Sequence, residues 1–136
     1  MKTLDLIRKL RDIENRMDAA RTKVAVYKSI AEKTTASLSS SGGSGSSTLT
    51  AHEDAVIRLM EAEQKYDETA LEYQRTVDEV MNRISIVKDS ERRTVAVAII
   101  LHHQSIRKIA KESHWGRSSV CRMFHEVLEE MNQDAK

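Results

Sequence analysis

The sequence predicts an all-α protein in which a long antiparallel helical hairpin of the coiled-coil type is followed by a three-helix helix-turn-helix domain. Its 136 residues include no proline, and only 4 % are aromatic while 32 % are charged, a composition typical of long amphipathic helices. Two long segments repeat apolar residues at heptad spacing, and a C-terminal segment combines an apolar pattern with many basic residues. We place the hairpin in residues 1–88 and the C-terminal domain in residues 89–136.

The first predicted helix repeats apolar residues at alternating steps of four and three. This spacing, kept over more than four heptads, turns one narrow face toward a partner helix. Thr34 is the only polar member of the series. The series consists of Leu6, Leu10, Ile13, Met17, Ala20, Val24, Tyr27, Ala31, Thr34 and Leu38.

The second predicted helix carries a similar series after residue 50, with Glu63 as its one polar member. The series consists of Val56, Leu59, Glu63, Tyr66, Ala70, Tyr73, Val77, Val80, Ile84 and Val87. Residues 1–38 contain nine basic and five acidic side chains, a net of +4, whereas residues 50–87 contain four and nine, a net of −5. The two helices should therefore attract each other.

The two series are separated by SSSGGSGSST, residues 39–48, which we expect to be neither helix nor strand. A flexible segment of this length spans roughly 17 Å, which is enough to join helices packed about 8 to 10 Å apart. Its composition is that of an engineered linker in place of a native loop, and a native low-complexity loop is the alternative. We assign it no function.

Several apolar residues fall outside both series. They are Ile7, Ile30, Ile57, Leu71 and Ile86. If the hairpin is only a rigid spacer, these residues have no partner; alternatively they form a second seam that joins two or more hairpins. We expect a homo-oligomer.

In the C-terminal domain, Asp89 or Ser90 can cap a helix over ERRTVAVAIIL, and Ser105 can cap a short helix over IRKIAKES. The sequence HWG then leads into a third helix over RSSVCRMFHEVLEEM. Three helices joined by two short turns result.

The last two helices have the spacing of a helix-turn-helix. Ala110 is small enough for a steep helix crossing, and His114 or Gly116 can adopt a positive φ in the turn. The apolar anchors of this arrangement are Ile106, Ile109, Trp115, Val120 and Met123. On the last helix, Val120, Met123, Phe124 and Val127 are expected to face inward.

Basic residues indicate what this domain binds. Residues 90–125 contain seven basic and two acidic side chains, a net of +5, together with four of the five histidines. Such a charge favours double-stranded DNA. The residues expected to read bases in the major groove are Arg117, Ser118, Ser119, Cys121 and Arg122. The residues expected to contact the DNA backbone are Ser105, Arg107, Lys108, Lys111 and His125, with Arg92 and Arg93 either adding to them or only solvating a helix end.

Residues 91–131, ERRTVAVAIILHHQSIRKIAKESHWGRSSVCRMFHEVLEEM, resemble the fourth region of bacterial sigma factors. The whole chain resembles phage-encoded transcriptional activators of the RinA, ArpU and LtrC type. This resemblance implies regulation of late genes of phages or mobile elements, by binding promoter DNA and contacting host RNA polymerase. It assigns the DNA-reading role to Arg117, Ser118, Ser119 and Arg122. Two residues depart from the pattern, since Gly116 replaces the usual serine cap and His114 the usual turn glycine.

Other functions have less support. Cys121 and His125 lie four apart, with His102 and His103 nearby, but a zinc site needs three or four convergent ligands. No catalytic constellation or glycine-rich phosphate loop is present, so we expect neither an enzyme nor a cofactor. The main alternative is an adaptor that binds RNA polymerase or a phage protein without reading DNA. With no signal peptide, no long apolar run and one cysteine, we expect a soluble cytoplasmic protein without a membrane partner.

Overall fold

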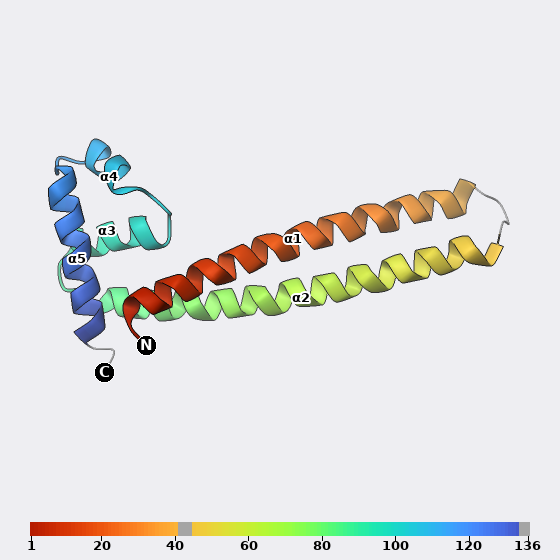
Figure 1. The fold of residues 1–136 in the computed structure, drawn as a ribbon, viewed down its shortest axis with the longest axis horizontal. Helices are drawn as coiled ribbons and strands as arrows, with labels where there is room; N and C mark the ends of the chain where they lie inside the picture. Colours follow the sequence, from red (N-terminus) through yellow and green to blue (C-terminus); the bar gives the residue numbers. More distant parts are fainter. Residues whose placement is uncertain (41–44, 134–136) are drawn as a thin grey trace. The chain divides into compact units, whose positions relative to one another are not determined.

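The protein is all-helical, as predicted. The structure, a computed structural model, describes the backbone of residues 1–40 and 45–133 and the side chains of residues 1–36 and 49–133. Every regular element in these ranges is an α-helix. The helices are α1 (Thr3–Ser40), α2 (Gly45–Ile86), α3 (Ser90–Ile100), α4 (Ile106–Glu112) and α5 (Arg117–Gln133) (Figure 1).

The chain divides into two compact units. The terminal unit combines Met1–Arg11 with Gln74–Lys136, and the helix-pair unit consists of Asp12–Tyr73. The first turns of α1 and the last turns of α2 therefore belong to the same unit as α3, α4 and α5. The boundary predicted between residues 88 and 89 lies inside the terminal unit.

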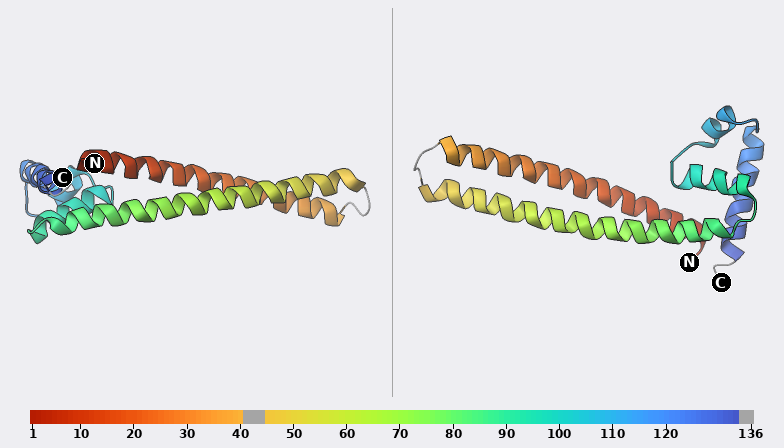
Figure 2. Two further views of the ribbon diagram at one scale, coloured as in Figure 1. Left: turned by 90° about the horizontal axis from the view of Figure 1, so that it is seen from below. Right: turned by 180° about the vertical axis from the view of Figure 1, so that it is seen from behind.

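In the helix-pair unit, α1 and α2 lie side by side and run antiparallel (Figures 1 and 2). Arg16 near one end of the unit donates two hydrogen bonds to the Glu72 carboxylate, at 3.2 and 3.0 Å. This contact raises the pKa of the Arg16 guanidinium. Near the other end, the hydroxyl of Thr34 lies 2.9 Å from Nδ1 of His52. The Arg16–Glu72 contact agrees with the attraction expected from the opposite net charges of the two helices.

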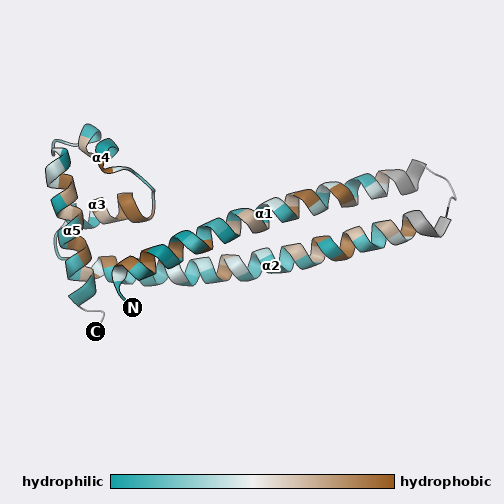
Figure 3. Ribbon diagram, viewed as in Figure 1, coloured by the Kyte–Doolittle hydropathy of each residue, from teal (hydrophilic) through white to brown (hydrophobic). Residues whose placement is uncertain are grey.

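The apolar series of α1 forms its buried face, as predicted. Leu6, Leu10 and Ile13 are fully buried, and the later members through Thr34 are buried or half-buried. Figure 3 shows hydrophobic and hydrophilic positions alternating along this helix. The side chain of Leu38, the last predicted member, lies outside the described residues. A sustained four-three spacing thus identified the contact face correctly.

In α2, the buried residues at every seventh position lie one position before the predicted residues. Glu63 is exposed, and its neighbour Ala62 is buried instead, together with Ala55, Thr69 and Thr76, each seven residues from the next. The predicted members Val56, Ala70 and Val77 are half-buried beside this face. Small side chains at every seventh position let the partner helix approach closely, and the Glu63 carboxylate avoids the large cost of burying a charge. The remaining predicted members, from Leu59 to Val87, are buried or half-buried.

Both long helices extend into the segment that was predicted to join them. Helix α1 continues through Ser40 and α2 begins at Gly45, so residues 39–40 and 45–48 are helical, contrary to expectation. Once a helix exists, each added residue gains a hydrogen bond for the dihedral angles that it fixes, and helices extend into poor helix formers for this reason. Residues 41–44 lie outside the described residues.

In the terminal unit, α3, α4 and α5 pack against one another, and the unit also includes the first turns of α1 and the last turns of α2. Ile100, Val127 and Met131 are fully buried, as are Val80 and Val87 of the α2 end. The first turn of α1 is held by two hydrogen bonds. The Thr3 backbone N–H donates to Oδ1 of Asn132 at 2.7 Å, and Arg83 donates to the Thr3 hydroxyl at 3.2 Å.

The apolar residues outside the two series are largely exposed. Ile30, Ile57, Leu71 and Ile86 have between 40 and 53 % of their surface accessible, whereas Ile7 is half-buried. None of the described helices combines the length and apolar character that crossing a membrane requires.

Candidate nucleic-acid interface

Capping side chains fix the starts of α3 and α4, as predicted. The Asp89 carboxylate accepts a hydrogen bond from the Glu91 N–H at 3.1 Å, and the Ser105 hydroxyl accepts one from the Lys108 N–H at 3.1 Å. Each bond satisfies a backbone donor that the first turn of a helix leaves free. The Ser105 cap therefore fixes the start of α4 directly before its basic residues Arg107 and Lys108.

The turn between α4 and α5 is built differently from the prediction, because neither His114 nor Gly116 adopts a positive φ. At this turn Ser113 has an extended conformation (φ −113°, ψ 178°). The Ser113 hydroxyl accepts a hydrogen bond from the Trp115 N–H at 3.3 Å. The one non-glycine residue with a positive φ in the described part of the chain is His103 (φ 56°), which lies between α3 and α4.

Gly116 precedes α5, as predicted, and its carbonyl accepts the first helical hydrogen bond, from the Val120 N–H at 3.1 Å. A Cβ added to Gly116 would have no heavy atom within 4 Å. The glycine is therefore required neither by its backbone conformation nor by space.

The predicted anchors of the last two helices meet in one apolar cluster. Val95 of α3, Ile109 of α4, and Val120 and Met123 of α5 form its buried centre. The half-buried members are Ala98, Ile99, Ile106, Ala110, Trp115 and Phe124. Because this face of α5 is buried in the cluster, the opposite face of the helix is turned toward solvent.

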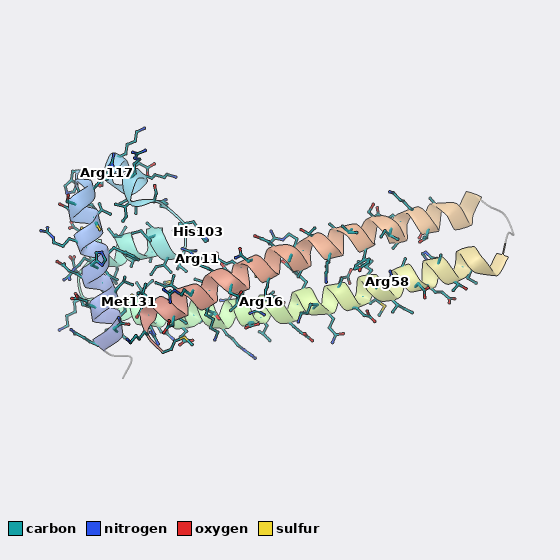
Figure 4. The ribbon with its side chains drawn as sticks, in the orientation of Figure 1. Arg11, Arg16, Arg58, His103, Arg117 and Met131 are labelled. Atoms are coloured by element: carbon teal, nitrogen blue, oxygen red, sulfur yellow. The ribbon has the colours of Figure 1, made fainter. Side chains whose placement is uncertain are left out.

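That opposite face carries the residues expected to read bases. Arg117, Ser118 and Arg122 are exposed, whereas Ser119 and Cys121 are half-buried at its edge. Arg117 lies at the first turn of α5 (Figure 4). Arg122 forms only a loose ion pair with Glu126, at 3.9 Å and with 72 % of the arginine side chain exposed. An exposed pair of this kind contributes little, so Arg122 can leave it at small cost.

The residues expected to contact the DNA backbone are also accessible. Ser105, Arg107, Lys108, Lys111 and His125 are exposed. Among the described residues, no carboxylate forms an ion pair with Arg107, Lys108, Lys111 or Arg117. These four side chains on α4 and the first turn of α5 therefore have no carboxylate within ion-pair distance among the described residues.

Arg92 and Arg93 have structural partners within the chain. Arg92 forms ion pairs with Asp89 at 3.3 Å, with Glu126 at 3.3 Å and with Glu130, and only 26 % of its side chain is exposed. Arg93 donates to the backbone carbonyls of Val87, at 2.6 Å, and Lys88, at 3.0 Å. These contacts tie α3 to α5 and to the end of α2, and we exclude both residues from the candidate interface.

Sequence reasoning missed the contribution of Arg11. Its guanidinium donates to the Ile99 carbonyl at 3.1 Å and lies 2.6 Å from a ring nitrogen of His103 (Figure 4). It thereby holds the end of α3 and the turn that leads into α4. Arg11 is 88 residues from Ile99 in sequence, and no local pattern indicates such a contact.

Metal binding gains no support from the arrangement of side chains. Within the described parts of the chain, no three histidine, cysteine, aspartate or glutamate side chains gather to form a potential metal site. Cys121 is half-buried and His125 exposed.

Comparisons with known proteins give no further assignment. No protein-family model, curated protein or solved structure matches the chain.

Proposed function

We propose that this protein is a sequence-specific DNA-binding transcriptional regulator, in which α4 and α5 form a helix-turn-helix and α5 enters the major groove. The observation that carries the proposal is the exposed cationic surface formed by α4 and the first turns of α5. Its members Arg107, Lys108, Lys111 and Arg117 are without an acidic partner among the described residues. Clustered cations with no internal counter-charge favour a polyanion such as duplex DNA.

The packing of α4 on α5 suits a helix-turn-helix. Ala110 is small and borders the apolar cluster, and Ile109 and Val120 are buried on the two sides of a short turn. A scaffold anchored in this way holds the first turns of the second helix away from the core, where they can meet base edges. In the proposed architecture, the antiparallel hairpin of α1 and α2 precedes this helix-turn-helix in the chain.

Charge along α5 indicates which half of the helix enters the groove. Arg117 and Arg122 lie in its first half, whereas Glu126, Glu129 and Glu130 lie in its second. Phosphates would attract the first half and repel the second. The positive end of the helix dipole also lies at Arg117 and favours an approaching phosphate.

The contacts divide into two classes. Arg117 and Arg122 are suited to guanine, because the guanidinium fork matches its O6 and N7 acceptors, and Ser118 and Ser119 can bond to bases or phosphates. Cys121 borders this set. Arg107, Lys108, Lys111, His125 and the hydroxyl of Ser105 are suited to phosphates, which position the protein without reading sequence.

The biological role that we propose follows from the resemblance to phage activators of the RinA, ArpU and LtrC type. The chain would act in the bacterial cytoplasm on promoter DNA of late genes, in contact with host RNA polymerase. The sigma-like sequence of residues 91–131 supports this role.

The proposal is tested by selecting bound fragments from phage or host genomic DNA with the purified full chain, followed by binding measurements on the recovered site. Arg122→Ala should lose about 1 to 3 kcal/mol on that site and relax its specificity. Lys108→Ala should weaken binding to all sequences alike. Lys28→Ala, which removes the same charge from the helix-pair unit, serves as the control and should bind as the parent does.

An adaptor that does not read DNA would behave differently. It would recover no enriched sequence, and both substitutions would leave its binding to RNA polymerase intact. That result would contradict the proposed function.

A further inference from the structure

The outer surface of α1 in the helix-pair unit combines exposed apolar and basic side chains. We define the basic face as Arg21, Val26, Ile30 and Lys33, which line one shallow groove. Val26 is 50 % and Ile30 41 % exposed, although both are large apolar side chains. Val26 and Ile30 are one helical turn apart, and adjoining exposed apolar side chains rimmed by polar ones are typical of surfaces that associate.

The outer surface of α2 has the complementary character. We define the acidic face as Ile57, Met60, Glu61 and Asp67, which line another shallow groove together with Glu63 and Gln64. Ile57 is 53 % and Met60 63 % exposed. The two faces thus share an apolar centre and differ in the sign of their charges.

The two faces lie at the same level along the helix pair. Arg21 interacts with Tyr66, which raises the pKa of its guanidinium, and the Thr34 hydroxyl lies 2.9 Å from Nδ1 of His52. Residues 21–33 of α1 therefore run alongside residues 53–66 of α2. The basic and acidic faces occupy these matching stretches.

One molecule cannot bring its own two faces together. The contact between α1 and α2 is made by their buried series, including Ala20, Ala31, Ala55 and Ala62, while the basic and acidic faces are exposed to solvent. Arg21 forms an exposed ion pair with Asp18 at 3.8 Å, whereas Lys33, Glu61 and Asp67 form no ion pair among the described residues. The complementary partner for each face is therefore available on a second copy of the chain.

We propose that copies of this chain associate by packing the basic face of α1 in one copy on the acidic face of α2 in the next. Charge favours this contact and opposes the contact of two basic or two acidic faces. Because the faces are level, neighbouring copies can pack in register with their helix pairs pointing the same way. Each α1 then meets the next α2 antiparallel, as it meets its own α2.

The contact joins two different faces, so it is heterologous, and it forms a closed ring when successive copies are related by a rotation axis parallel to the helices. In such an assembly, Arg11 and Gln74 of every copy lie at the same end. The chain continues into the terminal unit from these residues, so all terminal units are attached at that end. The association itself does not depend on DNA binding.

The test measures the mass of the full chain by light scattering after size exclusion, at low salt and across a concentration series. The parent should have a mass of at least twice the 15.4 kDa of one chain. Lys33→Glu and Glu61→Lys should each raise the apparent dissociation constant roughly tenfold or more, because an attraction becomes a repulsion. Lys9→Glu makes the same charge change outside both faces and should leave the mass unchanged.

The double variant K33E/E61K carries acid on the α1 face and base on the α2 face, so it should regain association. Circular dichroism verifies that each variant keeps its helices. A monomeric parent would assign the two faces to another partner and overturn the proposal. So would folded single variants that associate as tightly as the parent, or a folded double variant that remains dissociated.

Discussion

Arg11 donates a hydrogen bond from Nη2 to the backbone carbonyl of Ile99 at 3.1 Å. This bond connects the third turn of α1 with the end of α3, and the same guanidinium contacts the His103 ring. The last carbonyls of a helix lack partners within it, and a cation is a favourable donor to them. The first turns of α1 are therefore structural parts of the unit that carries the candidate interface.

Replacing Arg11 by methionine should destabilise the terminal unit by about 1 to 2 kcal/mol, since the apolar stem is kept and the charged hydrogen bonds are lost. Unfolding in urea is followed by the fluorescence of Trp115, the only tryptophan, which packs on the apolar cluster of this unit. Arg8→Met is the control, because Arg8 is 79 % exposed and pairs only loosely with Asp5. A transition unchanged by Arg11→Met would contradict this role.

Residues 89–136 alone should fail to fold, although the sequence suggested a boundary there. Val87 and Val80 are fully buried in the terminal unit, as are Leu6 and Leu10. Removing them exposes the apolar surfaces that they cover, and a remaining segment of about 48 residues is too short to bury a sufficient core. The fragment should show an exposed Trp115 emission and no cooperative thermal transition. A cooperative transition in the fragment would support the boundary predicted from sequence.

The register of α2 can be tested with two neighbouring residues. Ala62→Asp should destabilise the helix pair by about 2 kcal/mol or more, because it places an unpaired carboxylate in the buried series. Glu63→Ala should change the stability by less than about 0.5 kcal/mol, as exposed substitutions usually do. Thermal unfolding followed by circular dichroism at the helical band measures both. If Glu63→Ala were the more damaging substitution, the register predicted from sequence would be correct.

The sequence predicted the features that depend on local chemistry or on a strong period. The caps at Asp89 and Ser105 follow from side chains that can accept backbone N–H bonds, and the α1 series follows from large apolar residues at heptad spacing. The α2 series was misread because Val56 and Val77 are apolar and lie beside the true series. Its central positions, Ala62 and Thr69, are small, so hydrophobicity alone does not identify them.

Other features depend on contacts between distant parts of the chain and could not be predicted from local sequence. The partners of Arg92 are an aspartate three residues before it and two glutamates more than thirty residues after it. An arginine beside a helix start is equally compatible with a phosphate contact. The positive φ was assigned to His114 or Gly116 because glycine or a turn was expected there, whereas Ser113 turns the chain through an extended conformation.

Gly116 allows stability and DNA binding to be separated. Gly116→Ser should stabilise the terminal unit by roughly 0.5 kcal/mol, because a serine N-cap satisfies a free N–H of α5 and the site has room for a Cβ. Gly116→Asp should stabilise the unit at least as much, since a carboxylate also favours the helix dipole. The aspartate should nevertheless weaken DNA binding, because its charge lies beside Arg117 where a phosphate is expected. Urea unfolding followed by Trp115 and a DNA titration measure the two effects.

Equal DNA affinity of the serine and aspartate variants would show that the start of α5 does not face the duplex. Loss of stability in both variants would instead contradict the assignment of Gly116 as the N-cap of α5. The two measurements therefore test the helix start and the interface independently.

Arg92 and Lys108 should differ in how their removal changes the salt dependence of DNA binding. Lys108→Ala should reduce the slope of log K against log salt by about 1, because one phosphate contact and its released counterion are lost. Arg92→Gln should leave that slope unchanged, since its guanidinium is bound to Asp89, Glu126 and Glu130. It should instead lower the stability of the terminal unit, because three carboxylates lose their common cation. A reduced slope for a folded Arg92→Gln variant would return Arg92 to the phosphate contacts suggested by the sequence.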